Sequence, residues 1–336
     1  MHINDYGFLR VAAASPKLKV ADCDFNTEEI KRVIERAQGE KVQILCFPEL
    51  SLTGYSCGDL FFQKALQQKA VESLCELVRF LTERPFIIVI VGLPLRIKES
   101  LYNVAAVLSG EGILGFVPKT YIPNNNEFYE KRWFASGNQL TDTIATIEND
   151  IFNVPVEKET NKVPISSKGM IFHTSFGSFG IEICEDLWMP VPPSSHLTMQ
   201  GAELIFNLSA SNELVGKNNY RKSLVLQQSG RCHAAYIYAA AGWGESTTDM
   251  VFPGGCLIAE NGLLLAESAR FSPESELIIA DIDVDALRHD RMKNNNYAAA
   301  ASHDATKVNC YLDFITSKKI FRTFNPHPFI PSKEEI

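Results

Sequence analysis

The sequence predicts an α/β fold in which helices cover layers of β-strands. Short apolar runs alternate along the chain with segments whose apolar side chains recur every three or four residues, the patterns of buried strands and amphipathic helices. Hydrophobic residues make up 46% of the 336 residues, which is ample for a large core. Because no Gly/Ser linker or block of like charges divides the chain, we expect one domain over residues 1–316, followed by a proline-containing tail over residues 317–336.

Strands and helices alternate in the first part of the predicted fold. A helix begins near Thr27, where acidic residues precede an apolar stripe, and Gly39 ends it. A long helix over residues 60–81 carries Leu66 and Leu74 on a single apolar face. Apolar runs bounded by turn residues predict strands over residues 9–14, 42–47, 86–92, 102–108 and 113–117.

The second part of the fold begins with a polar insertion. Residues 139–168 are mostly polar, so we expect a long, irregular surface segment there. Apolar runs over residues 171–176 and 179–183 then predict one hairpin, and a second hairpin turns at Asn261 and Gly262. The remaining predicted elements are helices over residues 194–200, 219–233 and through 287, and strands over residues 204–208, 235–241, 256–259, 263–267 and 277–282.

Charge and composition exclude several classes of protein. The net charge of −8 argues against nucleic acid and anionic membranes as partners. The first ten residues lack the pattern of a signal peptide, and the longest apolar runs are too short to cross a bilayer. The eight cysteines show no paired spacing, so we expect reduced thiols in a cytoplasmic protein rather than disulfides or a zinc site. Asp and Glu residues show no metal-ligand spacing either, and we expect no metal or cofactor in this domain.

Cys184 is the first candidate for catalysis. It follows the predicted strand over residues 179–183, and Glu185 and Asp186 come directly after it. A thiol at a strand end lies next to free backbone N–H groups, where a nucleophile is useful. A lone cysteine is more often a small buried apolar residue, so this interpretation depends on two further segments.

Glu49 and Lys119 occur in the same local pattern, because each follows an apolar strand that ends in a proline. Proline cannot donate to a central strand ladder, so Pro48 and Pro118 place the two charges just beyond their strands. Taken singly, such charges are usually solvated. Together with Cys184 they form a set in which a carboxylate takes the thiol proton and an ammonium holds the oxyanion, with no metal required.

In order and spacing these residues resemble the catalytic triad of the nitrilase, or carbon–nitrogen hydrolase, superfamily. The resemblance covers nearly the whole chain and implies an α-β-β-α sandwich, in which two mixed β-sheets are flanked by helices. It also implies that Glu49, Lys119 and Cys184 are catalytic and that Glu127 is the second glutamate that braces the lysine.

Within that superfamily the chain looks most like the glutaminase domains of glutamine-dependent NAD synthetases. The segments that carry the likeness are residues 52–60, 207–211 with 215–217, 249–255, and 321–322 with 326–331. The resemblance implies glutamine as the substrate, and a synthetase domain that uses ATP and Mg as the partner. The Ser-Gly-Gly-x-Asp-Ser run of such a domain does not occur in this sequence, so we expect that domain to be absent from the chain.

The same resemblance implies a substrate site and an assembly. Tyr55, Phe128 and Trp188 are expected to wall the pocket, and the backbone N–H of Glu185 is expected to help hold the oxyanion. Ser211 and Lys217 are expected to bind the α-amino and α-carboxylate groups of glutamine. Lys217 stands where some relatives carry arginine, and the run Asn124–Asn126 replaces an aromatic residue that is common after the lysine. The superfamily also implies a homo-oligomer, at least a dimer.

Other functions remain open at this point. A free-standing amidase of the same superfamily, acting on another small amide, is the nearest alternative. A Cys–His hydrolase would use His173 or His233 with Cys184, although neither histidine lies at a matching strand end. A non-enzymatic docking module and a metal enzyme are the remaining alternatives.

Overall fold

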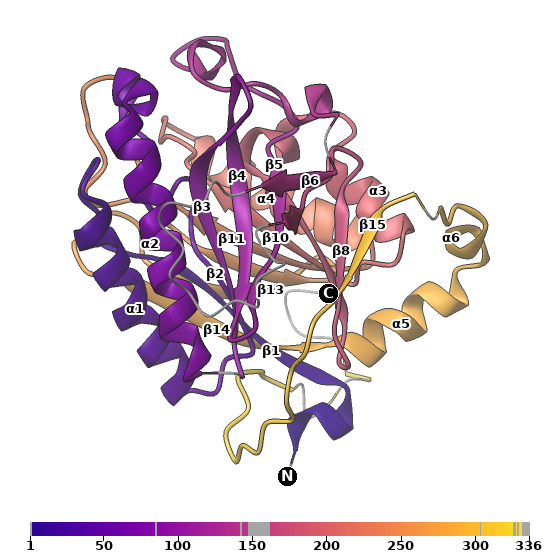
Figure 1. The fold of residues 1–336 in the computed structure, drawn as a ribbon. Coiled ribbons are helices and arrows are strands. Elements are labelled where there is room, and N and C mark those ends of the chain that lie inside the picture. Colours follow the sequence, from indigo (N-terminus) through magenta and orange to yellow (C-terminus); the bar gives the residue numbers. More distant parts are fainter. Residues whose placement is uncertain are drawn as a thin grey trace.

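Two large β-sheets lie face to face at the centre of the computed structural model (Figure 1). The structure describes residues 2–84, 86–141, 143–146, 162–302, 304–324, 327 and 329–330. The first sheet has six strands in the order β14-β1-β2-β3-β4-β5, and the second has seven in the order β13-β12-β11-β10-β9-β8-β15. Both sheets mix parallel and antiparallel neighbours, as the resemblance implied.

The strands of the first sheet are β1 (Phe8–Ser15), β2 (Ile44–Cys46), β3 (Ile88–Ile97), β4 (Ser100–Ser109), β5 (Gly112–Pro118) and β14 (Glu276–Asp283). Those of the second are β8 (Met170–His173), β9 (Ser178–Ile183), β10 (Leu204–Ser209), β11 (Ala235–Ala240), β12 (Leu257–Glu260), β13 (Leu263–Glu267) and β15 (Thr306–Asn309). Strand β15 was not predicted. It pairs in parallel with β8, more than a hundred residues earlier in the chain, so no local pattern announces its partner.

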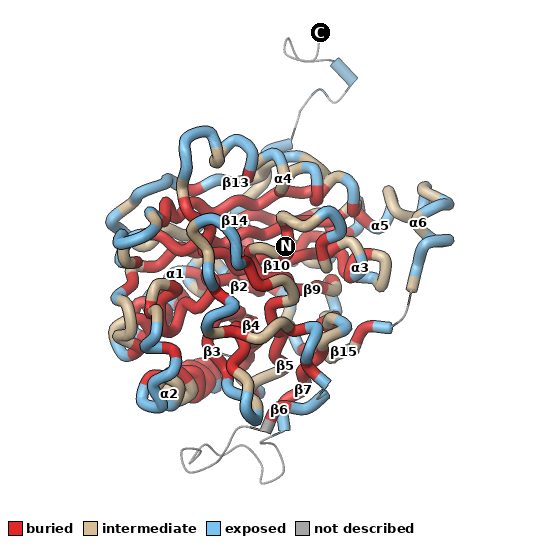
Figure 2. The backbone as a smooth tube through the Cα atoms, turned by 90° about the horizontal axis from the view of Figure 1, so that it is seen from above, coloured by how far each residue is buried: buried red, intermediate tan, exposed pale blue. Residues whose placement is uncertain are grey.

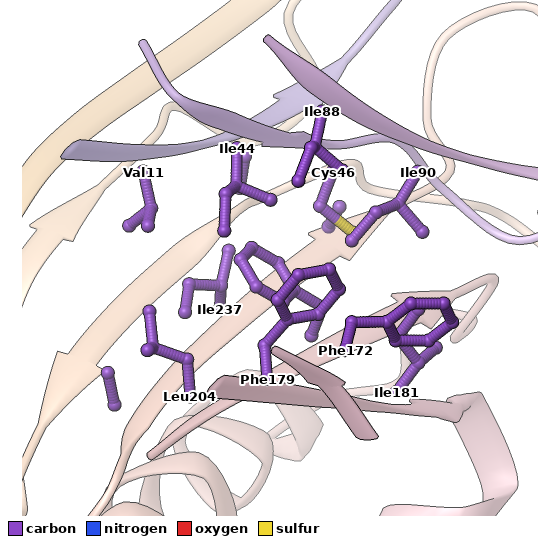
Figure 3. Packing of buried hydrophobic residues seen from close by; sticks show 14 of the residues in the cluster. Val11, Ile44, Cys46, Ile88, Ile90, Phe172, Phe179, Ile181, Leu204 and Ile237 are labelled. Atoms are coloured by element: carbon purple, nitrogen blue, oxygen red, sulfur yellow. The ribbon is translucent and has the colours of Figure 1, made fainter. Parts of the chain in front are cut away.

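The core between the sheets is apolar and closely packed. Figure 3 shows Ile44, Ile88 and Ile90 of the first sheet facing Phe179 and other side chains of the second. Phe172 and Phe179 stack with ring centroids 5.0 Å apart. Because interior packing resembles that of an organic crystal, this core fixes the spacing between the two sheets.

Helices cover the outer face of each sheet. Helices α1 (Cys23–Gly39) and α2 (Lys64–Thr82) lie together on the first sheet, as Figure 1 shows. Helices α3 (Pro193–Met199) and α4 (Lys217–Arg231) pack on the second. The result is the expected four-layer α-β-β-α sandwich, with buried strands inside and exposed loops outside (Figure 2).

The ends of several elements differ from the prediction. The helix predicted over residues 60–81 begins with a separate short helix, η2 (Gly58–Phe62), because Gln63 has an extended backbone before α2 starts. The predicted irregular insertion contains two paired strands, β6 (Ile144–Thr146) and β7 (Lys162–Pro164). Its residues 147–161 lie outside the described residues. The helix predicted after the last strand is α5 (Val284–Lys293), which continues beyond Leu287, and a further helix, α6 (Asn295–Ala299), follows it.

The start of the predicted tail packs against the first sheet. The guanidinium of Arg10 forms an ion pair with Asp281 at 2.7 Å and donates to the carbonyl of Lys319 at 2.7 Å. The backbone N–H of Phe321 donates to Asp281 at 2.8 Å. Within the part of the chain that the structure describes, no helix combines the length and the apolarity that crossing a membrane requires.

Candidate active site

The structure brings the ends of three strands together at one edge of the sandwich. Glu49 follows β2 and Lys119 follows β5 in the first sheet, whereas Cys184 follows β9 in the second. Lys119 Nζ lies 2.6 Å from Glu49 Oε1, and both side chains are fully buried. The charges of Glu49 and Lys119 both act on the pKa of the Cys184 thiol, which places the sulfur beside this ion pair.

The loop after β2 holds Glu49 rigidly. Leu50 adopts a left-handed backbone with φ of +51°, and Asn103 Nδ2 donates to Glu49 Oε1 at 2.6 Å. A Cβ atom on Gly92 would lie 2.2 Å from the backbone nitrogen of Leu50, so only glycine permits this close approach of β3 to the loop. Glu49 Oε2 is buried without a hydrogen-bond partner among the described residues, which leaves one carboxylate oxygen available to a proton.

Glu130, not Glu127, braces the lysine. Both carboxylate oxygens of Glu130 accept from Lys119 Nζ, at 2.8 and 2.9 Å, and the Tyr55 hydroxyl donates to Glu130 Oε1 at 2.7 Å. Burial raises the pKa of Glu130, while the Lys119 charge opposes that shift. The two glutamates lie three residues apart in a loop, and sequence order does not reveal which faces inward. Glu127 follows Asn126, whose backbone is left-handed, and its carboxylate accepts from Asn212 instead.

Cys184 lies on a sharp turn at the end of β9. Its backbone φ is +46°, an unusual value for a residue with a side chain, and such values are retained where the surroundings enforce them. The Cys184 N–H donates to Asn207 Oδ1 at 3.3 Å. Burial and the nearby Glu49 charge raise the pKa of the thiol, so the sulfur is protonated in the resting state.

A buried hydrogen-bond relay fixes Asn207. The Tyr236 hydroxyl donates to the Glu182 carboxylate and therefore accepts from Asn207 Nδ2, at 2.9 Å. This assignment directs the Asn207 oxygen toward the backbone of Cys184. Glu182 also accepts from the Ser194 N–H at 2.7 Å, and burial raises its pKa. The relay thus runs from β9 through β11 and β10 back to the nucleophile.

Asp186 joins the two sheets at the site. Its carboxylate accepts from the backbone N–H of Ile183 at 2.9 Å and of Tyr121 at 2.8 Å. Ile183 precedes Cys184, and Tyr121 follows Lys119 by two residues, so one side chain connects both catalytic segments. Burial raises the pKa of Asp186 to about 8. Neither Asp186 nor Asn207 was predicted as a site residue, because their partners come from distant parts of the chain.

Three of the predicted substrate-binding residues, Lys217, Trp188 and Phe128, lie close together. Lys217 Nζ lies 5.1 Å from the Trp188 ring centroid and 5.6 Å from that of Phe128. Ser211 is buried, and its hydroxyl has no hydrogen-bond partner within the described part of the chain. Burial lowers the pKa of Lys217 and raises that of the Glu185 carboxyl. Tyr55 is buried, and its hydroxyl contacts Glu130.

An open cavity of about 860 Å³ lies beside the segment that follows Lys119. Tyr121, Asn124, Asn125 and Glu185 are among the residues that line it. Asn124 and Asn125 belong to the run that replaces the expected aromatic residue, so this departure from the family pattern lies at a cavity next to the site.

The structure separates both candidate histidines from Cys184. His173 pairs with Ser178 at the start of β9, whereas Cys184 follows the end of that strand. His233 precedes the start of β11, which aligns through β10 with the start of β9. A strand rises about 3.3 Å per residue, so five or six residues separate them by about 17 Å. A Cys–His hydrolase is therefore excluded for these histidines. Among the described residues, no group of His, Cys, Asp and Glu side chains is arranged to hold a metal ion.

Comparison with known proteins agrees with this geometry. The family model for carbon–nitrogen hydrolases matches residues 10–292, and the chain belongs to that family of hydrolases. It is 34% identical over 337 residues to a glutamine-dependent NAD(+) synthetase of Mycobacterium bovis, an alignment that covers 97% of this chain and 48% of the relative. The chain thus spans about half the length of the curated relatives it matches.

Solved structures show the same fold. A glutamine-dependent NAD(+) synthetase from Cytophaga hutchinsonii superposes with a TM-score of 0.70 at 32% identity, covering 82% of this chain and 43% of that one. A carbon–nitrogen hydrolase from Helicobacter pylori superposes with a TM-score of 0.68 at 18% identity, covering 86% and 93% of the two chains. The second likeness supports the fold alone.

Proposed function

We propose that this chain hydrolyses the side-chain amide of glutamine to glutamate and ammonia through a thioester on Cys184. The observation that carries the proposal is the buried contact between Lys119 and Glu49, next to the Cys184 thiol. The likeness to glutamine-dependent NAD(+) synthetases supports glutamine as the substrate.

The first step is proton transfer and attack. Because the pKa of the Cys184 thiol is raised, the sulfur needs a base at the moment of attack. Glu49 is that base, through its unpartnered Oε2. The thiolate adds to the amide carbon, and Lys119 with the backbone N–H of Glu185 stabilises the oxyanion. One such donor typically contributes about 3 kcal/mol to lowering the barrier.

The second step releases the products. Glu49 passes its proton to the leaving nitrogen, ammonia departs, and a thioester remains on Cys184. A water molecule activated by Glu49 then hydrolyses the thioester to glutamate and restores the thiol. Throughout the cycle Glu130 neutralises part of the Lys119 charge and holds the ammonium in place.

The wider role is amidation by the released ammonia. In this proposal the ammonia passes to an ATP- and Mg-using synthetase domain, which amidates nicotinate adenine dinucleotide to NAD in the cytoplasm. The two-fold greater length of the relatives that share this segment supports a partner domain. The proposal includes assembly as a homo-oligomer, at least a dimer, as in the superfamily.

A panel of amides tests the proposed substrate. Purified protein, alone and mixed with a separately expressed synthetase domain of a relative, is assayed for ammonia release from glutamine, asparagine and simple aliphatic amides. Cys184→Ala removes the nucleophile and should abolish release while leaving the thermal melting curve unchanged, because the thiol makes no bond that the fold requires. Preference for an aliphatic amide over glutamine would favour the free-standing amidase, and turnover by Cys184→Ala would reject the thioester.

A further inference from the structure

We propose that Glu127 binds the α-ammonium group of the substrate, and that Asn212 holds Glu127 and Lys217 at the spacing of a zwitterionic amino acid head group. This inference rests on the proposed function and extends it from the reacting amide to the other end of the substrate. Glu127, expected to be catalytic, thereby becomes a residue that selects the substrate.

The Asn212 amide bridges two opposite charges. Its Nδ2 donates to Glu127 Oε1, and its Oδ1 accepts from Lys217 Nζ. An ammonium has only donors and a carboxylate only acceptors, so the amide has a single possible orientation here. Asn212 is 2% exposed, which means that its own position is set by packing.

The bridge keeps the two charges apart. Among the ion pairs of the described residues, none joins Glu127 directly to Lys217. Had they paired directly, each would have satisfied the other, and neither would attract a ligand. With one amide between them, a cation and an anion are held side by side, each retaining capacity for a further partner.

The position of the pair fits the head group of a substrate bound at Cys184. After burial, Cys184 and Glu127 are the first two side chains whose electrostatic interactions affect the pKa of Lys217, which places all three in one neighbourhood. The rings of Trp188 and Phe128 flank the ammonium and shield it from water. Because burial lowers the pKa of Lys217, an anion at this point is favoured, and the α-carboxylate of an amino acid supplies it.

Glu185 is the competing carboxylate. Lys119 and Glu49 are the foremost charges acting on its pKa, with Lys217 after them, and its side chain lines the open cavity. Glu127 alone is tied to Lys217 through a shared hydrogen-bond partner. The geometry therefore favours Glu127 for the α-ammonium group.

Analogues that lack one charge test the assignment. L-Glutamine is compared with 5-amino-5-oxopentanoate, which lacks the α-ammonium group, and with 4-aminobutanamide, which lacks the α-carboxylate. Glu127→Gln should raise KM for glutamine about 10- to 100-fold with little change in kcat, and should leave KM for 5-amino-5-oxopentanoate unchanged. Lys217→Met should raise KM for both substrates that carry the carboxylate and leave KM for 4-aminobutanamide unchanged.

Two further variants complete the design. Asp249→Asn removes an exposed carboxylate that accepts from Tyr129 on the same loop as Glu127, and it should leave every KM unchanged. Asn212→Ala should raise KM for glutamine, since its two charged partners can then pair with each other. Melting temperatures within a few degrees of the wild type show that these effects are local.

The outcomes separate this inference from the proposed function. The inference is overturned if Glu127→Gln raises KM equally for both substrates that carry the carboxylate. It is also overturned if Glu185→Gln, and not Glu127→Gln, raises KM for glutamine alone. Both outcomes are compatible with the proposed glutaminase reaction. Wild-type protein that hydrolyses simple amides and not glutamine overturns the proposed function, and this inference with it.

Discussion

The two ends of the candidate site are built differently. At the proposed catalytic end, Glu49, Lys119 and Glu130 are at most 1% exposed, and Lys119 contacts both carboxylates directly. At the outer end, Glu127 and Lys217 are half-buried, and a single amide separates them. Glu49 and Lys119 follow buried strands closely, whereas Glu127 and Glu130 share the segment after β5 and Lys217 is the first residue of α4.

This difference separates chemistry from selectivity. Charges buried without water interact strongly and have little freedom to move, which suits groups that must act on a transition state. Half-buried charges on loops can change between relatives without disturbing the strands that hold the catalytic end. The departures from the family pattern, Lys217 and Asn124–Asn126, lie at the outer end, as this division requires.

The largest effect is expected at the most buried charge. Lys119→Met removes the oxyanion donor and should reduce kcat about 10³-fold. It also leaves two carboxyls in the core without their cation, so we expect the free energy of unfolding to fall by about 3–5 kcal/mol near neutral pH. Urea unfolding and steady-state kinetics measure the two effects.

The pH dependence of that variant provides its control. Burial already raises the pKa of Glu130 above its value in the unfolded chain. Between these two pKa values the native protein therefore binds more protons than the unfolded chain does. The stability of Lys119→Met should therefore decline as the pH rises from the unfolded pKa of about 4 toward neutrality. Lys131→Met, at an exposed position near Glu130, should alter neither stability nor turnover. A flat stability profile for Lys119→Met would contradict the buried carboxyl pair.

The protonation state of the nucleophile is the next test. Because its pKa is raised, the Cys184 thiol remains protonated at neutral pH. Alkylation of the resting protein by a small neutral reagent should rise about tenfold per pH unit up to pH 9 without levelling off. Mass spectrometry of the Cys184 peptide follows the rate. A plateau near neutral pH would show a preformed thiolate and would remove the need for Glu49 as a base.

A smaller effect is expected behind the nucleophile. Tyr236→Phe deletes the hydroxyl that orients Asn207, so the Cys184 backbone should become less well fixed. We expect kcat to fall about 3- to 10-fold with KM unchanged, since the lost hydrogen bond to the Asn207 amide contributes about 1 kcal/mol. A rise in KM with normal kcat would assign Tyr236 to substrate binding instead.

The smallest effect is expected at Phe128, the aromatic side chain beside Lys217. Phe128→Leu keeps an apolar side chain but removes the ring beside Lys217, so KM for glutamine should rise about 2- to 5-fold. Leu214→Ala truncates an exposed side chain on the neighbouring loop and should leave KM unchanged. A large drop in kcat for Phe128→Leu would contradict the assignment of the outer end to substrate binding alone.

The sequence predicted the layers and the meeting of Glu49 and Lys119 because both depend on local patterns. An apolar strand, a proline and a charge form a short signal, and it located Glu49 and Lys119. Glu130 was missed in favour of Glu127, because the two glutamates lie in one loop and their order in the sequence does not reveal which carboxylate faces Lys119. Asp186, Asn207 and Asn212 were missed as partners, because an ordinary polar side chain gains its role only when a distant segment arrives beside it.

The proposed catalytic groups come from opposite sheets: Glu49 and Lys119 follow strands of the first sheet, and Cys184 follows a strand of the second. The hydrophobic core between the sheets, shown in Figure 3, therefore also sets the distance between Cys184 and Glu49, across which the thiol proton moves in the proposed reaction. A larger side chain in this core, such as that of Ile181→Phe, would increase the spacing between the two sheets. We expect it to lower the turnover rate more than it lowers the stability of the protein. Turnover in this molecule thus reports on how well its interior is filled.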